Sequence, residues 1–350
     1  MEGRSRSVIP AIAGVMAVLV MVPSCTDASP EVLPPLAERP VLEAAPFPLN
    51  PGAAESAAFG DAVAVVNPAW NADSGDDSDL PAVAAWSSDG TWRELPEPEP
   101  VAGRRLLSTD QGLMLLGVDG RRLQLQYLGL TDAEWTELDI PDVEFTTETE
   151  FWEAVSGDLA VMGVSSGWLV ADDDGEVQLF EFDSPSNRQV CVVDGRLLEL
   201  RYTTTVDPFG KAATTTKPGQ LSELDPNDSD PSWERRADTP QDVEVTGTAI
   251  TCGPDGPVLL TAGGEVSYDA ATDEWTSRPA QAPGIVAAML ALNYHGILAD
   301  GTSYAIDPGG EVFRRTTASE WSDTGIRGNQ LVTTPTRAFA VGPDVIVTVP

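Results

Sequence analysis

Short runs of apolar residues alternate with polar turns along most of the chain after residue 54. The clearest unit is Gly264-Glu-Val-Ser-Tyr-Asp-Ala-Ala-Thr-Asp-Glu-Trp-Thr-Ser-Arg-Pro279. It predicts a short strand over Val266 to Tyr268, a polar turn over Ala270 to Asp273, and a second strand that Trp275 opens and Pro279 stops. Variants of this unit recur at Ser88–Pro96, Thr131–Pro141, Pro231–Pro240 and Ala318–Gly325.

A second landmark consists of apolar strands that break at a Gly-containing turn and then resume. An Asp-Gly turn between apolar runs favours a hairpin, because that turn needs positive φ. Seven predicted hairpins alternate with the strand pairs at a spacing of roughly 40 residues. They lie at Phe59–Val66, Gly117–Gly120, Val155–Met162, Cys191–Gly195, Cys252–Gly256, Asn293–Gly296 and Val341–Val349.

The pattern predicts an all-β fold. Pro and Gly interrupt every candidate helix after residue 25, and four short strands per repeat are typical of a single β-propeller with four-stranded blades. Six strand pairs of the outer type are visible, the third using Phe180 or Phe182 and the sixth either Phe313 or Trp321. Seven hairpins favour seven blades over six. The last hairpin, over 330–349, would then take its outer strand from the N-terminal arm.

The recurring tryptophans have a structural explanation. A large ring at the start of an outer strand can fill the gap between neighbouring blades. We therefore expect blade-packing roles for Trp92, Trp135, Trp233, Trp275 and Trp321.

The repeats resemble kelch-type repeats, like those of the galactose-oxidase-like central domain. The resemblance is best over 246–279, with Tyr268-Asp269, the polar turn, Trp275 and the double glycine Gly263-Gly264, and weaker copies cover most of 54–350. Ser87-Ser-Asp-Gly-Thr-Trp92 also resembles the Asp-box turn of sialidase-like propellers, one residue short of its spacing.

The N-terminus reads as a targeting segment. Arg4 and Arg6 precede an apolar run from Val8 to Val22, which is shorter than the ~20 residues that span a bilayer. Val22-Pro-Ser-Cys25 resembles a bacterial lipoprotein signal, which implies a lipidated (palmitate-bearing) Cys25. A conventional signal peptide cut nearby is the alternative. The expected organisation is a signal peptide over 1–24, a Pro/Ala/Glu-rich tether over 25–53 and the propeller over 54–350.

The charge is lopsided, with 55 acidic residues against 20 basic residues and a net charge of −35. Such a surface repels phosphate backbones and acidic lipid headgroups, so we expect no nucleic-acid partner and no membrane contact except through the lipid anchor.

Cys191 and Cys252 occupy equivalent places in consecutive repeats, each written Cys-x-x-Asp-Gly. Equivalent positions on the innermost strands of adjacent blades lie close together, and an exported protein can be oxidised. We predict a disulfide between them, with two buried thiols as the alternative.

Two long excursions, Asn67–Leu80 and Thr203–Gly219, fall between the second and third strands of their blades. Long loops on one face of a rigid scaffold are where binding usually occurs, although they can also be solvated. The acidic runs Asp172–Glu176 and Asp225–Asp230 carry ligands that Ca²⁺ prefers, yet neither matches a known calcium loop, so solvated turns are the expected interpretation and bound Ca²⁺ the alternative. We expect no cofactor.

The sequence contains few candidate catalytic residues. The one histidine, His295, falls in a predicted tight turn and should be solvated there. A single histidine provides neither a copper site of the galactose-oxidase kind nor a His-rich zinc site, and no nucleophile motif accompanies it. We assign no catalytic or metal residues. Paired carboxylates for glycoside chemistry stay open.

These observations favour a lipid-anchored binding module at the outside of the cell membrane. Its partner would be an envelope protein or glycan, and the sequence names no ligand-binding residue. The alternative is a carbohydrate-active propeller enzyme, a hydrolase or lyase, that uses channel carboxylates. Such an enzyme should show two or three carboxylates converging with an Arg or Tyr.

Overall fold

A computed structural model gives the fold, and all of the residues it describes belong to one compact unit, Val32–Pro350. It describes residues 41–42, 55–67, 70, 81–119, 122–141, 152–156, 159–164, 166–172, 175–182, 187–202, 204–205, 214–215, 219–241, 243, 250–261, 264–278, 295–307, 309–317, 320–342 and 345–350. All regular structure within these residues is β-strand.

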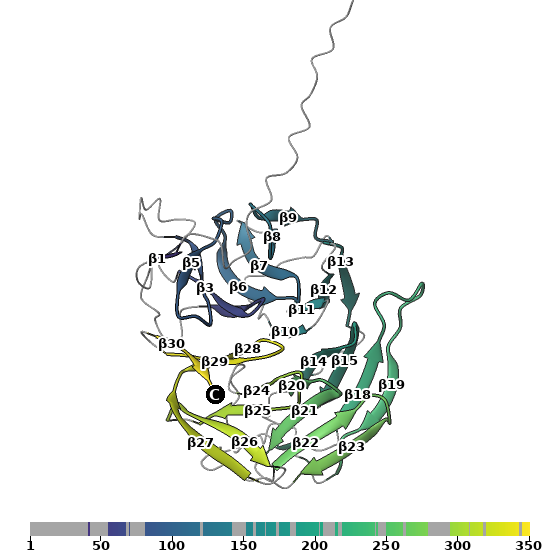
Figure 1. Ribbon diagram of the computed structural model, residues 1–350. Coiled ribbons are helices and arrows are strands. Elements are labelled where there is room, and N and C mark those ends of the chain that lie inside the picture. Colours follow the sequence, from purple (N-terminus) through teal and green to yellow (C-terminus); the bar gives the residue numbers. More distant parts are fainter. Residues whose placement is uncertain are drawn as a thin grey trace, which may run out of the picture. The chain divides into compact units, whose positions relative to one another are not determined.

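The strands form seven antiparallel sheets in chain order, which are the blades of a propeller (Figure 1). The first blade contains β2 (Ser56–Phe59), β3 (Ala62–Val66), β4 (Val83–Trp86) and β5 (Trp92–Glu94). The second contains β6 (Ala102–Ser108), β7 (Gly112–Asp119), β8 (Arg122–Gly129) and β9 (Thr136–Leu138). The third contains β10 (Trp152–Ser156), β11 (Leu159–Val164), β12 (Gly167–Asp172) and β13 (Val177–Glu181).

The fourth blade carries an insertion. Its sheet contains β14 (Asn187–Val193), β15 (Arg196–Tyr202), β18 (Gln220–Leu224) and β19 (Glu234–Asp238). The strands β16 (Thr204–Thr205) and β17 (Thr214–Thr215) pair with each other between β15 and β18.

Three further blades complete the series. The fifth contains β20 (Ile250–Gly253), β21 (Gly256–Thr261), β22 (Gly264–Asp269) and β23 (Glu274–Arg278). The sixth contains β24 (His295–Ile297), β25 (Ser303–Ile306), β26 (Glu311–Thr317) and β27 (Glu320–Arg327). The seventh contains β28 (Gln330–Thr333), β29 (Ala338–Val341) and β30 (Ile346–Val349).

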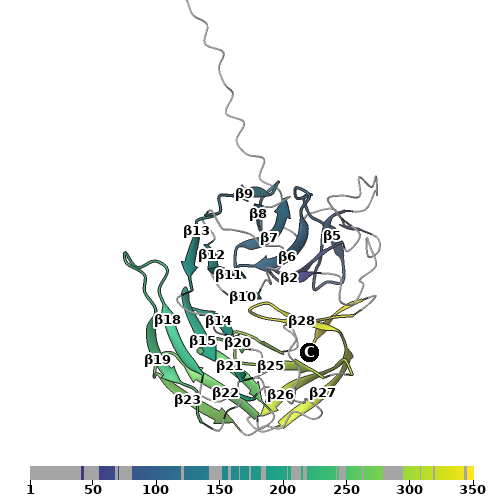
Figure 2. The ribbon, with the colours of Figure 1, turned by 180° about the vertical axis from the view of Figure 1, so that it is seen from behind.

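The first strand of each blade contacts the first strand of the next, in the order β2, β6, β10, β14, β20, β24 and β28, and β28 returns to β2. The Ser56 hydroxyl donates a hydrogen bond to Gln330 Oε1 at 2.8 Å across this closing contact. The same order of blades is visible from behind in Figure 2. The prediction of an all-β, single propeller is therefore confirmed, with seven blades rather than six.

The described part of the N-terminal arm extends the first blade, not the last blade as expected. Strand β1 (Val41–Leu42), which lies within the predicted tether, pairs with β5 and so extends the first blade to five strands. The sheet of the seventh blade has three strands in the order β28-β29-β30. The signal segment and the rest of the predicted tether lie outside the described residues.

Buried apolar residues form six clusters, each shared by two neighbouring blades. The cluster of blades 1 and 2, for example, joins Phe59 and Ala64 to Leu113 and Leu115. Strand β3 is buried on both faces, because its Ala and Val side chains pack alternately against the blade before and the blade after it. A strand that is buried on both faces appears in the sequence as a continuous apolar run.

The predicted Gly turns do not all join the same pair of strands in their blades. Asp194 and Gly195 adopt positive φ, of 50° and 69°, in the predicted turn between β14 and β15. In blades 2 and 7 the predicted Gly turns join the second and third strands. Asn293–Gly296 is wrong as a turn, since His295 opens strand β24 and the turn follows at Asp300–Gly301.

Candidate functional site

The antiparallel order of each blade separates its connections onto two faces of the propeller. Connections from the second to the third strand, and from the fourth strand to the next blade, emerge on one face. We call this the long-connection face, because it receives both of the predicted excursions. Residues 67–80 join β3 to β4, and residues 203–219 join β15 to β18.

Three blade-to-blade connections of comparable length reach the same face, over 139–151, 239–249 and 279–294. Most of their residues lie outside the described ranges. Their composition differs widely. Residues 139–151 are rich in Asp and Glu, 203–219 contains both lysines of the chain, and 279–294 has no charged residue. One face thus collects the longest and most diverse segments of the propeller.

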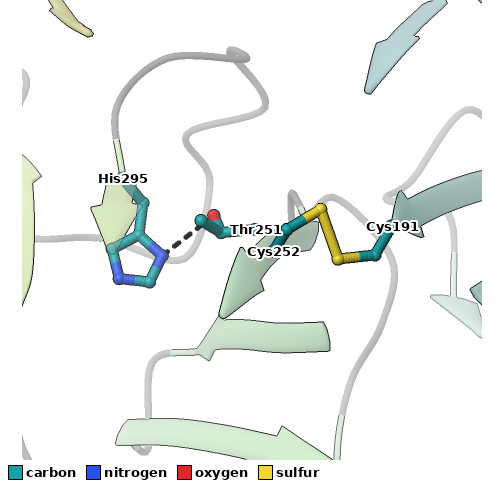
Figure 3. Close-up of a disulfide and its surroundings, with 4 residues drawn as sticks. All are labelled: Cys191, Thr251, Cys252 and His295. Carbon is teal, nitrogen blue, oxygen red and sulfur yellow. Dashed lines mark hydrogen bonds between the residues drawn. A yellow bond between two sulfur atoms is a disulfide. The ribbon is translucent and has the colours of Figure 1, made fainter. Parts of the chain in front are cut away.

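The predicted disulfide is present, and it joins the innermost strands of blades 4 and 5 (Figure 3). Cys191 lies on β14 and Cys252 on β20, with their Cα atoms 5.3 Å apart. This separation falls within the range of natural disulfides. The prediction from the repeat positions is confirmed.

His295 lies on β24, the first strand of blade 6, and its side chain points toward blade 5 near this disulfide (Figure 3). Its Nδ1 atom is 3.0 Å from Thr251 Oγ1, next to Cys252 (Figure 3). Its Nε2 atom is enclosed and has no hydrogen-bond partner within the described ranges. Burial lowers the pKa of His295 to about 4, with Glu265 opposing the shift and Arg315 adding to it. The expectation of a solvated turn histidine was therefore wrong.

Glu265 and Arg315 form an ion pair across the interface between blades 5 and 6. Glu265, on β22, has a side chain that is 3% exposed and pairs closely with Arg315 on β26. The Ser303 hydroxyl donates to Glu265 at 3.4 Å, and Arg315 also donates to the Gly301 carbonyl at 3.1 Å. The six apolar clusters lie at the other interfaces of the ring, whereas this buried ion pair joins blades 5 and 6 in the described part of the chain.

A second buried carboxylate, Glu199 on β15, lies between blades 3 and 4. It accepts hydrogen bonds from Arg188 Nη1 at 2.8 and 2.9 Å and from the indole of Trp168 at 2.6 Å. It also pairs closely with Arg201. The Phe182 ring stacks 4.4 Å from the Arg188 guanidinium, and Trp233 lies 5.8 Å from that of Arg201. The hydrogen bonds and ion pairs of Glu199 compensate its burial and fix the position of its carboxylate.

The third carboxylate, Glu223 on β18, lies nearer to solvent. It pairs with Arg196 and Arg236, each at 2.8 Å. Burial alone would raise the pKa of Glu223, but the hydrogen bonds from Arg236 and Arg196 outweigh that effect and lower it. Nearby, burial and a hydrogen bond to Asp273 raise the pKa of Tyr268.

The acidic runs weighed as calcium ligands use their carboxylates to shape turns. Asp172 Oδ1 accepts the Glu176 N–H at 2.8 Å, and Asp225 Oδ1 accepts the Asn227 N–H at 3.0 Å. Such bonds are ordinary for Asp in turns. Within the described residues, no group of three or more His, Cys, Asp or Glu side chains could hold a metal ion.

Each tryptophan expected to pack between blades lies on or next to the fourth strand of its blade. Four of them pack against apolar clusters shared with the preceding blade: Trp92, Trp135, Trp233 and Trp275. Trp321 is 7% exposed, and its ring centroid lies 6.4 Å from that of His295. Its indole nitrogen is enclosed without a hydrogen-bond partner among the described residues.

Cys25, the expected lipidation site, lies outside the described residues. In the part of the chain that the structure describes, there is no helix with the length and apolarity needed to cross a membrane.

Among known proteins, the chain resembles solved structures only at low sequence identity. No known protein family and no curated protein matches the chain. The structures it resembles include AztD from Citrobacter koseri, with 12% identity, 84% of this chain and 74% of that chain covered, and a TM-score of 0.43. Another is XC5397 from Xanthomonas campestris, described as a gluconolactonase, with 11% identity, 89% and 98% coverage and a TM-score of 0.40. A third, YCF48 bound to D1 peptide, has 13% identity, 66% and 72% coverage and a TM-score of 0.40. At these values none of them indicates the function of this chain.

Proposed function

We propose that the protein is an extracytoplasmic, lipid-anchored propeller of the kelch type that binds an envelope protein or glycan. The long-connection face forms the binding surface, and the blades hold it in place. Seven blades closed into a ring and a disulfide between two inner strands make a rigid scaffold. Variable loops on such a scaffold commonly carry recognition.

The observation that supports this proposal best is the contrast between the loops and the buried charges. Glu199, Glu223 and Glu265 lie at separate places in the ring, and arginines pair with each of them. The chain thus uses its buried carboxylates to join strands and blades. The face with the long connections is where sequence variety is concentrated.

Export and anchoring rest on the N-terminal sequence. Val22-Pro-Ser-Cys25 supplies the acceptor cysteine, and the disulfide suits an oxidising compartment. A net charge of −35 keeps the body of the protein away from an anionic bilayer, so a lipid on Cys25 would provide the membrane contact.

Capture of partners from the native envelope tests the binding face. In one variant a short Gly-Ser linker replaces residues 206–213 of the long-connection face. In the matched control the same change replaces residues 227–230, in the hairpin between β18 and β19 on the opposite face. The first variant should lose the captured protein or glycan, while the control should retain it. Equal capture by both variants would place binding elsewhere.

Membrane fractionation tests the anchor separately. Cys25→Ser should move the protein from the membrane to the soluble fraction and abolish the acyl mass. A wild-type protein that is already soluble and unacylated would remove the anchor from the proposal and leave the binding face to be judged on its own.

A further inference from the structure

The seventh blade differs from the other six at its outer edge. In blades 1 to 6 a fourth strand covers the third, and in the first blade β1 adds a fifth. Among the described residues, β30 has β29 as its single hydrogen-bonded neighbour. Among the described residues, this blade is therefore the one whose third strand has an open outer edge.

The ladder shows which backbone groups point away from β29. The Gly342 N–H donates to the Val345 carbonyl at 2.8 Å, which makes these two residues a hydrogen-bonded pair. Such pairs alternate along an antiparallel ladder, so Val347 also bonds to β29. Ile346 and Thr348 then direct their N–H and C=O groups outward. Two donors and two acceptors with this spacing are what an incoming strand needs.

The surroundings of this edge would hold an added strand on both sides. Ile346 packs with Trp92 of the first blade, while Val349 packs with apolar residues of the sixth. Strand β27 of the sixth blade contacts β30. Val345, directly before the edge, is 53% exposed and is the one exposed large apolar side chain among the described residues. An added strand would therefore lie between two blades, with its side chains facing each in turn.

The other blades show what such a strand should look like. Each of the six fourth strands carries an aromatic residue within it or directly before it, and the positions are Trp92, Trp135, Phe180, Trp233, Trp275 and Trp321. In four of these strands, β9, β19, β23 and β27, most of the remaining residues are exposed and polar. The seventh blade has neither the strand nor its aromatic residue in the described part of the chain.

We propose that the open edge of β30 is a strand-acceptor site, where an extended segment of another polypeptide with an aromatic residue near its start adds as the fourth strand of blade 7. Backbone hydrogen bonds supply the affinity in this mode of recognition, and the aromatic side chain supplies the specificity. The net charge of −35 favours a segment that carries Lys or Arg. The site is separate from the long-connection face.

The chain's own N-terminal arm is a poor occupant. Its strand β1 already pairs with β5. Residues 26–54 also contain prolines at 30, 34, 35, 40, 46, 48 and 51, and proline cannot donate to a strand ladder. These features favour a segment from a different chain.

A peptide from the chain's own repeats provides the probe. Residues 231–237, Pro-Ser-Trp-Glu-Arg-Arg-Ala, contain Trp233 and the start of the fourth strand of blade 4, with two arginines against one glutamate. Titrated onto the full chain, this peptide should bind saturably. A scrambled peptide, and one in which Ala replaces the Trp, should bind at least ten-fold more weakly.

The matched protein variants are Thr348→Pro and Thr348→Ala. The proline removes an outward N–H but leaves the bonds to β29 in place, so it should weaken peptide binding at least ten-fold. The alanine keeps the backbone donor and should bind like the wild type. A peptide that does not bind the wild type, or that binds Thr348→Pro equally well, would overturn the proposal.

Amide hydrogen exchange gives a second test that does not depend on the folding of a variant. The amides of Ile346 and Thr348 should exchange quickly in the free protein and become protected when the peptide is added. Protection in the free monomer would mean that the chain covers its own edge. Protection that appears with protein concentration, together with a dimer in sedimentation, would mean that a second copy occupies it. Either result overturns the assignment to another polypeptide.

Discussion

Blades 1 and 2 meet through Phe59, Ala64, Leu113 and Leu115, whereas blades 5 and 6 meet through Glu265, Arg315 and Ser303. The first interface buries apolar side chains, with an ion pair between Glu55 and Arg105 at its partly exposed margin. The second encloses an ion pair and the Nε2 atom of the half-buried His295. The two interfaces perform the same task with side chains that respond differently to pH and to substitution.

The physical contrast follows from what each kind of side chain loses on burial. Apolar side chains gain free energy when they leave water, in proportion to the area removed. A buried ion pair must recover the hydration free energy of two charges, and it recovers that energy only while both partners are present. The interface of blades 5 and 6 should therefore be the more sensitive to the loss of a single partner.

Glu265→Ala should have the largest effect, because it leaves the Arg315 guanidinium enclosed without its carboxylate. Removing one partner of a buried pair costs about 3–5 kcal/mol. Urea unfolding measures this loss. Glu223→Ala is the matched control, since its arginine partners are 33% and 51% exposed, and it should cost about 1 kcal/mol. Equal losses in the two variants would show that the burial of the Glu265 ion pair does not increase its contribution to the free energy of unfolding.

Leu115→Ala probes the apolar interface of blades 1 and 2, where Leu115 is fully buried. The lost burial and the cavity left behind should cost about 3 kcal/mol. The loss should be the same at pH 7 and pH 5, because Leu115 lies in an apolar cluster and does not itself titrate. A loss that depends strongly on pH in this range would show that the two interfaces are coupled.

Much of the scaffold could be predicted from the repeats. Strand period, Asp-Gly turns and recurring tryptophans mark the blades, and equivalent positions of Cys191 and Cys252 indicate their disulfide. His295 was misplaced, because Asn293-Tyr-His-Gly296 looks like a turn, while Asp300-Gly301 supplies the actual one. Gly-containing turns also occur between second and third strands, so they do not identify the strand pair that they join.

The buried charges could not be predicted, because the repeat pattern does not say which side chains of adjacent blades meet. Glu265 and Arg315 lie in different repeats, and each looks like an ordinary surface residue in sequence. A weak signal existed for Glu199, which interrupts the apolar run Leu197-Leu-Glu-Leu200. A charge inside such a run indicates a buried partner, although it does not identify that partner.

His295 should make the stability of the blade 5–6 interface depend on pH. In the unfolded chain the pKa of a histidine is near 6.5, and in the folded protein the pKa of His295 is about 4. Protons therefore bind the unfolded state first as the pH falls, so stability is lost from pH 6.5 down to about 4 and is unaffected above that window. The full loss is about 3 kcal/mol.

The difference between the wild type and His295→Asn isolates this effect from other groups that titrate in acid. Asparagine retains a polar atom near the position of Nδ1, so it can still contact Thr251, but it does not titrate. Urea unfolding across pH 7 to 4 should show the gap between the two proteins shrinking as the pH falls. Leu115→Ala should stay parallel to the wild type. A constant gap for His295→Asn would mean that the imidazole has the same pKa in the folded and unfolded states, as in open water, and a gap that widens as the pH falls would mean that it is charged in the fold.

The smallest effect is expected from replacing both members of the ion pair, and it shows what the polar interface contributes. Glu265→Leu together with Arg315→Met removes both charges and fills a similar volume, so stability should change by about 1 kcal/mol or less, even though Glu265→Ala alone costs several. The double variant also removes the two charged groups that act on His295, so burial alone would then set the pKa of its imidazole.

If the double variant is as unstable as Glu265→Ala, the pair with Ser303 and Gly301 stabilises the fold in its own right. If its stability matches the wild type, apolar side chains can replace this ion pair between the two blades. The polar residues would then matter chiefly for how the joint between blades 5 and 6 responds to acid.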